Sequence, residues 1–375
     1  MLFKIIKKII KKEKSHNLIK KLKILIGGAS SKFFHLKEFQ KSLTKLGVEC
    51  KLVIDTDICD GFPSRKISNW FQTRNKFDRL ISDFKPDIIL VDRQRHFAKI
   101  ASRQKIPLMI HLRGDIWKEI KWAKETTYKS FLKKIALEVW VSIAKETFDK
   151  SFLIIPICNH LEKIVKENYP NKKTTIMYQG INPKRWYPQK GMKLKHPCVG
   201  LLQGAVIWGK AQEMLILENV LRSMPNITFY WVGDGPYRDK ILPILEKYEN
   251  FKWLGPLQYP DKVREYLSEI DIYALISGLD MSPHTILEAQ LMKKPVIATN
   301  IGGIPELMKN NETGFLVEKG NSNELIEKIS FLLENKEKMN EMGIAGRKFV
   351  EENFSWEKIA NEFVNILKRE KLFKE

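Results

Sequence analysis

The sequence predicts an α/β protein with two doubly wound domains, each a parallel sheet covered by helices. The first reason is length, because 375 residues exceed one ordinary core and suit two domains. The second is that short apolar runs alternate with amphipathic stretches in both halves, a pattern typical of parallel sheets with helices on both faces. The third is that residues 182–197 contain three prolines and one glycine without periodicity, which is typical of a linker.

The first 16 residues are expected to form a basic amphipathic helix. In the segment MLFKIIKKIIKKEK, the apolar residues and the lysines occupy opposite arcs of a helical projection. Such a helix can lie in a membrane surface with its lysines on anionic head groups. A helix docked on its own domain, or a frayed tail, is the alternative interpretation.

The first domain is expected over residues 17–182. A Gly27-Gly28 turn follows its first strand, a helix is expected at 34–46, and Cys158 and the run 175–178 end this half. Its strands are expected at 23–26, 51–54, 87–91 and 108–111.

A linker at 183–197 leads to the second domain, residues 198–355, which repeats the alternation. Residues 356–375 contain a last helix, expected to pack back on the first domain. Two such domains should face each other across a cleft at the carboxyl ends of their strands, where ligands bind in these folds. The strands of the second domain are expected at 199–202, 227–232, 252–254, 272–275, 295–298 and 315–317, and further helices at 322–333 and 356–368.

The charge is distributed very unevenly. Residues 1–190 carry 41 Lys and Arg against 18 Asp and Glu, whereas the remainder carries 24 against 26. The first half should therefore face something anionic, either nucleic acid or an acidic membrane surface. Because the chain has no recognisable nucleic-acid motif, we expect no nucleic-acid partner.

The cysteines and acidic pairs give no metal signal. The four cysteines form no CxxC pair and have no histidine at a zinc-site spacing, so buried free thiols are expected. Asp55-Thr56-Asp57 is interpreted as a loop. No apolar run approaches the roughly 20 residues of a membrane-spanning helix, and no secretory core follows the N-terminus. We expect a cytoplasmic protein.

The stretch from Asp280 to Glu288 is the strongest candidate site. It starts as a turn and continues as an apolar, helix-compatible segment. The first N–H groups of a helix, aided by the helix dipole, form a site for a diphosphate. Carboxylates on either side supply acceptors for sugar and ribose hydroxyls. On spacing alone, two such acids are more often solvated surface groups.

The surrounding motifs resemble a known family. Asp280 to Ala289 is followed by KPVIAT at 294–299, GGIPE at 302–306 and NETGFLV at 311–317, with VGDGP at 232–236 and FSWE at 354–357. In this order they resemble the C-terminal domain of retaining GT-B glycosyltransferases of family 4, whose two domains are Rossmann-like. The likeness is close from about residue 199. In the first half it is looser, resting on Gly27-Gly28, His111 and QGIN at 179–182.

The resemblance implies roles for several residues. Glu288 would bind the donor ribose, Asp280 the transferred sugar, and Lys210 the diphosphate as it leaves. The family usually has Glu at the position of Asp280, and an arginine at the position of Ala205, for which Arg113 is a candidate substitute. The donor phosphates would also meet Ser282, Pro283, His284 and Thr285.

Four further positions are candidate donor-site residues. His111 matches a family histidine near the donor sugar, although a histidine at a strand end is commonly structural. Gly27 and Gly28 permit close approach of the backbone to phosphate, but such a pair also simply makes turns. Gly233 belongs to the matched VGDGP motif.

Together these features predict a retaining hexosyltransferase. Its donor would be a UDP- or GDP-linked sugar, and its acceptor a glycan or a lipid-linked molecule at the inner face of the cell membrane. No cofactor and no metal are expected, because the GT-B family as a whole does not need one. The alternative is a catalytically weakened scaffold that binds a nucleotide sugar or a partner protein.

The aromatic and basic stretch from Trp117 to Lys134 has two interpretations. It could contact a membrane or the acceptor, or it could be a domain helix with a solvated lysine face.

Overall fold

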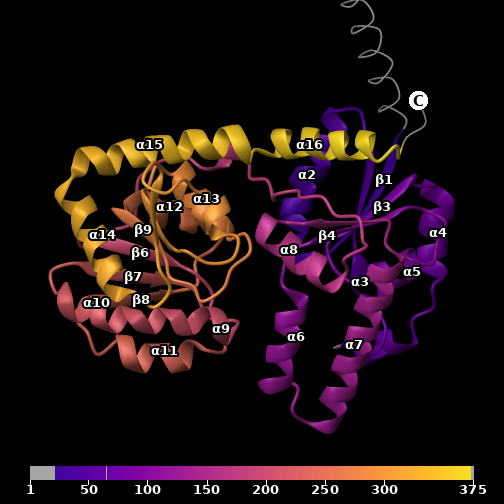
Figure 1. Cartoon of the computed structure of the whole chain (residues 1–375), viewed down its shortest axis with the longest axis horizontal. Helices are drawn as coiled ribbons and strands as arrows, with labels where there is room; N and C mark the ends of the chain where they lie inside the picture. The colour runs from indigo at the N-terminus through magenta and orange to yellow at the C-terminus, as the bar shows by residue number, and fades with distance from the viewer. Residues whose placement is uncertain (1–21, 65, 373–375) are drawn as a thin grey trace, which may run out of the picture. The chain divides into compact units, whose positions relative to one another are not determined.

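The computed structural model describes residues 22–64 and 66–372 and divides them into two compact units. Unit 1 comprises the chain up to Gly180 together with residues from Trp356 onward, and unit 2 comprises Ile181–Ser355. The N-terminal segment expected to be an amphipathic helix lies outside the described residues. Each unit contains one parallel sheet, which confirms the predicted fold class (Figure 1).

The sheet of unit 1 has five strands in the order β2-β1-β3-β4-β5. All its pairings are parallel. Four of the strands are largely buried apolar runs, as expected for a sheet covered on both faces, whereas the edge strand β2 is partly exposed. They are β1 (Lys23–Gly28), β2 (Glu49–Ile54), β3 (Ile88–Val91), β4 (Leu108–Leu112) and β5 (Leu153–Pro156).

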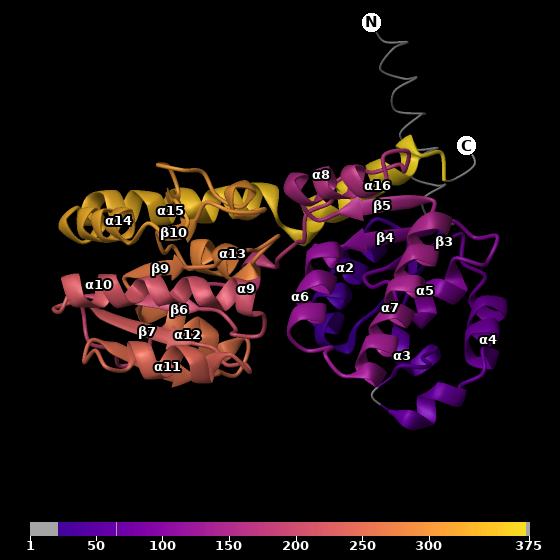
Figure 2. The same cartoon turned by 60° about the horizontal axis from the view of Figure 1, so that its bottom comes forward.

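Helices cover both faces of this sheet, and Figure 2 shows α5 and α7 side by side in front of its strands. In the core, α16 packs on α2 through Phe39, whose ring contacts Trp356 and Phe363 at centroid distances of 5.5 and 5.4 Å. The helices are α2 (Phe33–Lys45), α3 (Asp55–Ile58), α4 (Asn75–Phe84), α5 (His96–Ala101), α6 (Ile116–Glu125), α7 (Phe131–Lys150), α8 (Asn159–Asn168) and α16 (Trp356–Arg369), with a 3₁₀ helix η2 at Ile67–Phe71.

The expected end of this half was placed wrongly. The fifth strand is β5, whereas residues 175–178 form no strand, and Thr174 makes only a single bridge to Ile154. Proline is unusual in a strand, and Pro156 closes β5 opposite Leu112. The apolar run at 152–155 marks this strand locally, but Pro156 at its end weakens the pattern.

The sheet of unit 2 has six strands in the order β11-β10-β9-β6-β7-β8. The strands are β6 (Cys198–Leu202), β7 (Thr228–Val232), β8 (Phe251–Gly255), β9 (Ile272–Leu275), β10 (Val296–Thr299) and β11 (Gly314–Val317). The helices are α9 (Trp208–Ala211), α10 (Leu217–Ser223), α11 (Arg238–Leu245), α12 (Asp261–Glu269), α13 (His284–Leu291), α14 (Ser322–Glu334) and α15 (Lys336–Asn353).

Residues 183–197 pack on unit 2. Trp186 is buried, and the Arg264 guanidinium donates to the carbonyl of Arg185 at 2.9 Å and to Gln189 at 3.0 Å. This stretch is therefore a strap on unit 2 rather than a free connection.

Cysteine and membrane expectations can be compared with the described residues. No cysteine is in a disulfide; Cys59, Cys158 and Cys198 are buried and Cys50 is partly buried. Asp55 begins α3 and forms an ion pair with Arg93, so the Asp55-Thr56-Asp57 motif has a structural partner. None of the helices within the described residues is long and apolar enough to cross a bilayer.

Candidate functional site

The carboxyl edge of the unit 2 sheet has its topological switch point between β6 and β9. These neighbouring strands are far apart in sequence, and the chain proceeds from β6 to β7 on one side while β10 follows β9 on the other. Connections leave such a point in opposite directions and open a crevice in which ligands bind. The connections after β6 and β9 carry Lys210 and the Asp280–Glu288 stretch, so the strand order brings the predicted residues to one place.

The two connections are held against each other by specific contacts. The Gln203 side chain donates to the carbonyl of Ile276 at 2.9 Å and accepts from its N–H at 3.2 Å. The Gly278 N–H donates to the carbonyl of Lys210 at 3.0 Å. A Cβ at Gly278 would lie 2.2 Å from the carbonyl oxygen of Gly209. Glycine at this position therefore permits the close approach of the two loops.

Lys210 and Asp280 form an ion pair. The Lys210 Nζ lies 3.1 Å from Asp280 Oδ1, which also accepts from the Met281 N–H at 2.9 Å. The Asp280 carbonyl accepts from the Gly303 N–H at 2.9 Å, and the preceding Gly302 has φ 62°. A Cβ at Gly302 would lie 2.0 Å from this carbonyl oxygen. The GGIPE motif thus fixes the Asp280 backbone.

The start of α13 follows directly. Pro283 is its N-cap and offers no side-chain acceptor to the first N–H groups. Thr285 Oγ1 accepts from the Tyr273 hydroxyl at 2.6 Å, and the buried Ser282 hydroxyl has no partner among the described residues. Because the first N–H groups of a helix lack partners within it, this turn has the chemistry of an anion site. His284 is the first residue of the helix.

Glu288 lies one turn further along α13 and is only 3% exposed. Its Oε1 accepts from the Tyr259 hydroxyl at 3.0 Å. Burial raises the pKa of Glu288 to about 7, against a smaller lowering effect of the Tyr259 hydrogen bond. Burial beside this carboxyl also raises the pKa of Tyr259. Sequence analysis missed Tyr259, since no local pattern links two residues 29 positions apart.

Position 205, where the resemblance implies an arginine, is buried in this chain. Ala205 is fully buried, its N–H donates to the Asp234 carbonyl at 3.0 Å, and its carbonyl accepts from the Tyr237 N–H at 3.1 Å. Gly233 sits nearby with φ 150°, and a Cβ there would lie 2.0 Å from the Gln203 carbonyl oxygen. The VGDGP turn therefore packs on the loop after β6. Arg113, the candidate substitute, lies in unit 1.

The carboxyl edge of unit 1 holds the remaining predicted residues. Gly27 and Gly28 end β1, and a Cβ on them would lie 2.4 Å from the Phe97 ring and 2.0 Å from Leu36 Cδ1, respectively. Helix packing against β1 is thus sufficient reason for both glycines. The next N–H, of Ala29, donates to Asp92 Oδ1 at 3.1 Å. Sequence analysis missed Asp92, although it directly follows the apolar strand β3, just as His111 lies near the end of β4.

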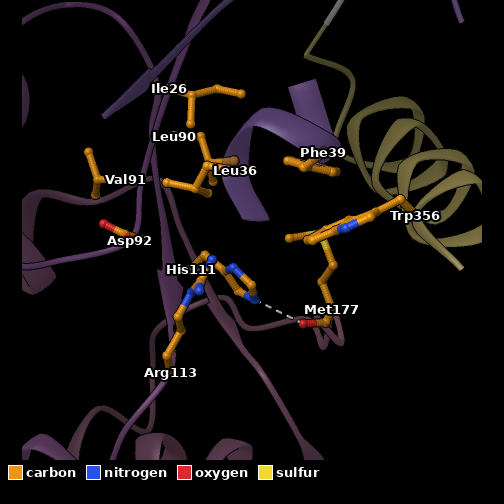
Figure 3. A pocket seen from close by; sticks show the side chains of 10 residues that line it. All are labelled: Ile26, Leu36, Phe39, Leu90, Val91, Asp92, His111, Arg113, Met177 and Trp356. Carbon is orange, nitrogen blue, oxygen red and sulfur yellow. Dashed lines mark hydrogen bonds between the residues drawn. The ribbon is translucent and has the colours of Figure 1, made fainter. Parts of the chain in front are cut away.

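His111 lies in a small pocket walled by apolar side chains (Figure 3). Its Nε2 lies 3.0 Å from the carbonyl oxygen of Met177, which can only accept, so Nε2 carries the proton and Nδ1 is left as an acceptor. Burial lowers the pKa of His111 to about 3, and the nearby Arg113 adds to the effect. His111 is therefore neutral and cannot act as a general acid near neutral pH.

Polar groups without partners surround this histidine. Arg113 Nη1 donates to Gln179 Oε1 at 3.2 Å, but Arg113 Nε and Nη2, Asp92 Oδ2 and Gln179 Nε2 have no partner among the described residues. Burial raises the pKa of Asp92 and lowers that of Arg113. Figure 3 shows the Arg113 side chain running alongside His111. This set of donors and acceptors suits a ligand rich in hydroxyl groups.

One group of potential metal ligands occurs within the described residues. His196, Cys198 and Asp271 place one ligand atom each within 4.8 Å of one another. Both ring nitrogens of His196 are already bonded, to Asp271 at 2.8 Å and to Glu269 at 3.0 Å. Cys198 and Asp271 begin β6 or immediately precede β9, so the group lies at the amino edge, opposite the switch point. We assign it a structural role.

Comparison with known proteins shows which family this part of the chain resembles. Residues 208–349, which contain Lys210, Asp280 and α13, match the family model described as glycosyl transferases group 1. Residues 208–349 of this chain are thus similar to the group 1 glycosyltransferases. The GDP-mannose-dependent monoacylated alpha-(1-6)-phosphatidylinositol monomannoside mannosyltransferase of Corynebacterium glutamicum is 34% identical over 43% of this chain and 44% of its own. The chain spans about half the length of the curated relatives it matches.

Solved structures show that this chain has the GT-B fold. A sucrose-phosphate synthase from Thermosynechococcus elongatus aligns with a TM-score of 0.71 and 14% identity, over 93% of this chain and 99% of its own. Anabaena HepE, solved with UDP and glucose, aligns with a TM-score of 0.65 and 17% identity, over 92% and 99%. At these identities the likeness concerns the fold alone.

Proposed function

We propose that this chain is a group 1 glycosyltransferase that transfers a sugar, with retention of anomeric configuration, from a nucleotide-sugar donor to a glycan or lipid-linked acceptor at the inner face of the cell membrane. The observation that carries the proposal is the switch point of unit 2. There Lys210 of α9, after β6, and the first turn of α13, after β9, would form one anion-binding place. A diphosphate has the charge and the oxygen acceptors that this place requires.

The residues of unit 2 would each bind a different part of the donor. The α13 N-terminus and Lys210 would hold the diphosphate, and Glu288 would accept hydrogen bonds from ribose hydroxyls. Asp280 would orient the sugar. The bond between the anomeric carbon and the diphosphate oxygen breaks with its electron pair on that oxygen, where the ammonium of Lys210 is most effective in the transition state.

The second half of the reaction would use the acceptor hydroxyl. Its oxygen forms the new bond to the anomeric carbon on the face that the diphosphate leaves, and its proton passes to the departing phosphate. Hydrogen-bonding groups around His111, including Asp92 Oδ2 and the Arg113 guanidinium, would bind sugar hydroxyls. His111 would contribute its Nδ1 as a neutral acceptor.

The nature of donor and acceptor is inferred from charge and from relatives. The mannosyltransferase of Corynebacterium glutamicum is named for GDP-mannose and a phosphatidylinositol mannoside, and HepE was solved with UDP. The excess of Lys and Arg over Asp and Glu within residues 1–190 suits an acceptor at an anionic surface. We also propose that transfer needs neither metal nor cofactor. Unchanged product formation in EDTA would support that part, and loss of activity restored by a divalent ion would refute it.

The alternative, a weakened scaffold, is motivated by two features of this chain. Asp280 already neutralises Lys210, and a methyl group occupies the position at which the family carries an arginine. Such a protein would bind nucleotide sugars without releasing the nucleotide.

A donor panel separates these two proposals. UDP-, GDP- and ADP-sugars are screened for thermal stabilisation and for nucleotide release in the presence of glycan and polyprenyl-phosphate acceptors, with Glu288→Ala as the control. Stabilisation and release, both lost in Glu288→Ala, support transfer. Stabilisation without release supports the scaffold. NMR of the product's anomeric proton then tests retention, which an inverted product would contradict.

A further inference from the structure

Exposed apolar side chains are concentrated in two segments of unit 1. Among its described residues, eight large apolar side chains are exposed, and seven of these lie in residues 62–71 and 131–135. Three of these side chains are exposed over most of their surface, Phe71 to 81%, Phe131 to 76% and Leu132 to 76%. The full set of seven is Phe62, Ile67, Trp70, Phe71, Phe131, Leu132 and Ile135.

Contacts through His96 link the first segment to α7, the helix that carries the second segment. His96 Nε2 donates to the Phe62 carbonyl at 2.9 Å, and the same ring contacts Trp140 of α7 at a centroid distance of 5.2 Å. Trp140 is nine residues from Phe131, or roughly 14 Å along the helix axis. We call the seven side chains, with the lysines described below, the apolar edge.

The topology makes the start of α7 project beyond the sheet. Helix α6 begins just after the carboxyl end of β4, and α7 ends just before the amino end of β5. A helix of 20 residues is roughly 30 Å long, whereas the four residues of β5 span roughly 13 Å. The first turns of α7 therefore extend past the carboxyl edge, as Figure 1 shows for the joined ends of α6 and α7.

The root and the tip of this helical hairpin differ. At the root, Trp117 stacks on Phe148 at 5.8 Å with an interplanar angle of 17°, so this tryptophan belongs to the interior. At the tip, Phe131 and Leu132 remain exposed. Helix packing thus explains the aromatic residues of the root but not the apolar residues of the tip.

Lysines accompany the exposed apolar residues. Lys121, Lys129, Lys133 and Lys134 on the hairpin and Lys66 beside η2 are all exposed, and within the described part of the chain none of them has an ion-pair partner. Exposed apolar side chains flanked by unpaired lysines are typical of surfaces that lie on anionic lipid. A second copy of this face is a poor partner, because it would bring like charges together.

We infer that the apolar edge binds the surface of an anionic lipid bilayer, with Phe71, Phe131 and Leu132 in the acyl boundary and the lysines on the head groups. The inference rests on the proposed function in placing the acceptor at a membrane, but its evidence is independent of the donor site. It would hold the carboxyl edge of unit 1, with the pocket around His111, close to the bilayer.

Vesicle sedimentation of the full chain tests the binding. We expect the protein to sediment with vesicles of phosphatidylcholine and phosphatidylglycerol at low salt, and to stay in solution with phosphatidylcholine alone or at high salt. Leu132→Asn should weaken binding about tenfold. Ile344→Asn, the same kind of apolar-to-polar change at an exposed position of unit 2, should have no effect. Replacing Lys129, Lys133 and Lys134 by Gln should weaken it about a hundredfold. The same change at Lys247, Lys252 and Lys319 of unit 2 controls for net charge.

Hydrogen exchange locates the contact. Added anionic vesicles should slow amide exchange over residues 66–71 and 126–135. The inference is overturned if the chain does not sediment, if sedimentation occurs without protection of these segments, or if the two triple lysine variants behave alike. It is also overturned if Leu132→Asn abolishes a concentration-dependent dimer, because the edge would then be an interface between copies.

A second assay keeps this result separate from the proposed transfer reaction. Nucleotide release with a water-soluble acceptor and no vesicles should be the same in the natural chain and in Leu132→Asn. If no variant releases nucleotide but vesicle binding follows the pattern above, the transferase proposal fails and the membrane surface stands. If nucleotide release is normal and vesicle binding is absent, the membrane surface fails and the transferase proposal stands.

Discussion

Glu288 gives the sharpest test of the site, because its burial has a measurable effect on stability. Its pKa in the folded protein is about 7, against an ordinary value of 4.5. Between these values the folded chain retains a proton that the unfolded chain releases. The free energy of unfolding therefore decreases as pH rises from 4.5. Above about pH 7 the stabilising contribution of the raised Glu288 pKa is fully lost. Two and a half pKa units correspond to about 3 kcal/mol.

Glu288→Gln removes this titration while keeping an oxygen that can accept from the Tyr259 hydroxyl. The added amide N–H groups have a cost that does not depend on pH. We therefore expect the stability of the variant relative to the natural chain to rise by about 3 kcal/mol between pH 4.5 and pH 8. Other groups that titrate in this range, such as His196, cancel in the comparison.

Urea unfolding is monitored by hydrogen exchange at the amides of β9 and α13, so that the stability of unit 2 alone is measured. Glu352→Gln, at an exposed position of α15, is the control and should give a flat difference. A difference for Glu288→Gln that is equally flat across this pH range would refute the assignment of a buried, largely protonated carboxyl.

Four further results are expected. Nucleotide affinity should fall as pH drops below about 7, because ribose hydroxyls donate to the carboxylate form of Glu288, and a pH-independent Kd in isothermal titration calorimetry would contradict this role. Lys210→Met should lower kcat for nucleotide release on the order of a hundredfold or more, whereas an effect on KM alone would place the lysine in ground-state binding. Gly278→Ala should weaken donor binding in thermal-shift titration, because its Cβ would lie 2.2 Å from the Gly209 carbonyl oxygen, and an unchanged shift would mean that the two loops can separate without loss. His196→Gln should lower the Tm below pH 6.5 and lose its effect at higher pH, since hydrogen bonds to Asp271 and Glu269 raise the pKa of His196 and its stabilisation disappears as pH rises through that value; an effect that grows with pH would show the opposite linkage.

The sequence by itself determined the two parallel sheets and the order of the site motifs along the chain. Burial on both faces makes each strand an apolar run, and a turn before a helix marks where an anion can bind, so both features are visible locally. Lys210, Asp280 and Glu288 were singled out before their positions were known because they stand in motifs that resemble those of family 4. The failure at β5 is also local, because Pro156 interrupts the usual strand composition.

Only the tertiary structure decided which of these residues meet. Lys210 and Asp280 are 70 positions apart, and they pair because β6 and β9 are neighbours in the sheet. The burial of Glu288 against Tyr259, the burial of Ala205 and the outward projection of Phe131 and Leu132 likewise depend on the tertiary structure. Periodicity predicts which face of a segment is buried. Strand order and helix length decide which other residues that face contacts, and the chemistry of the site follows from those contacts.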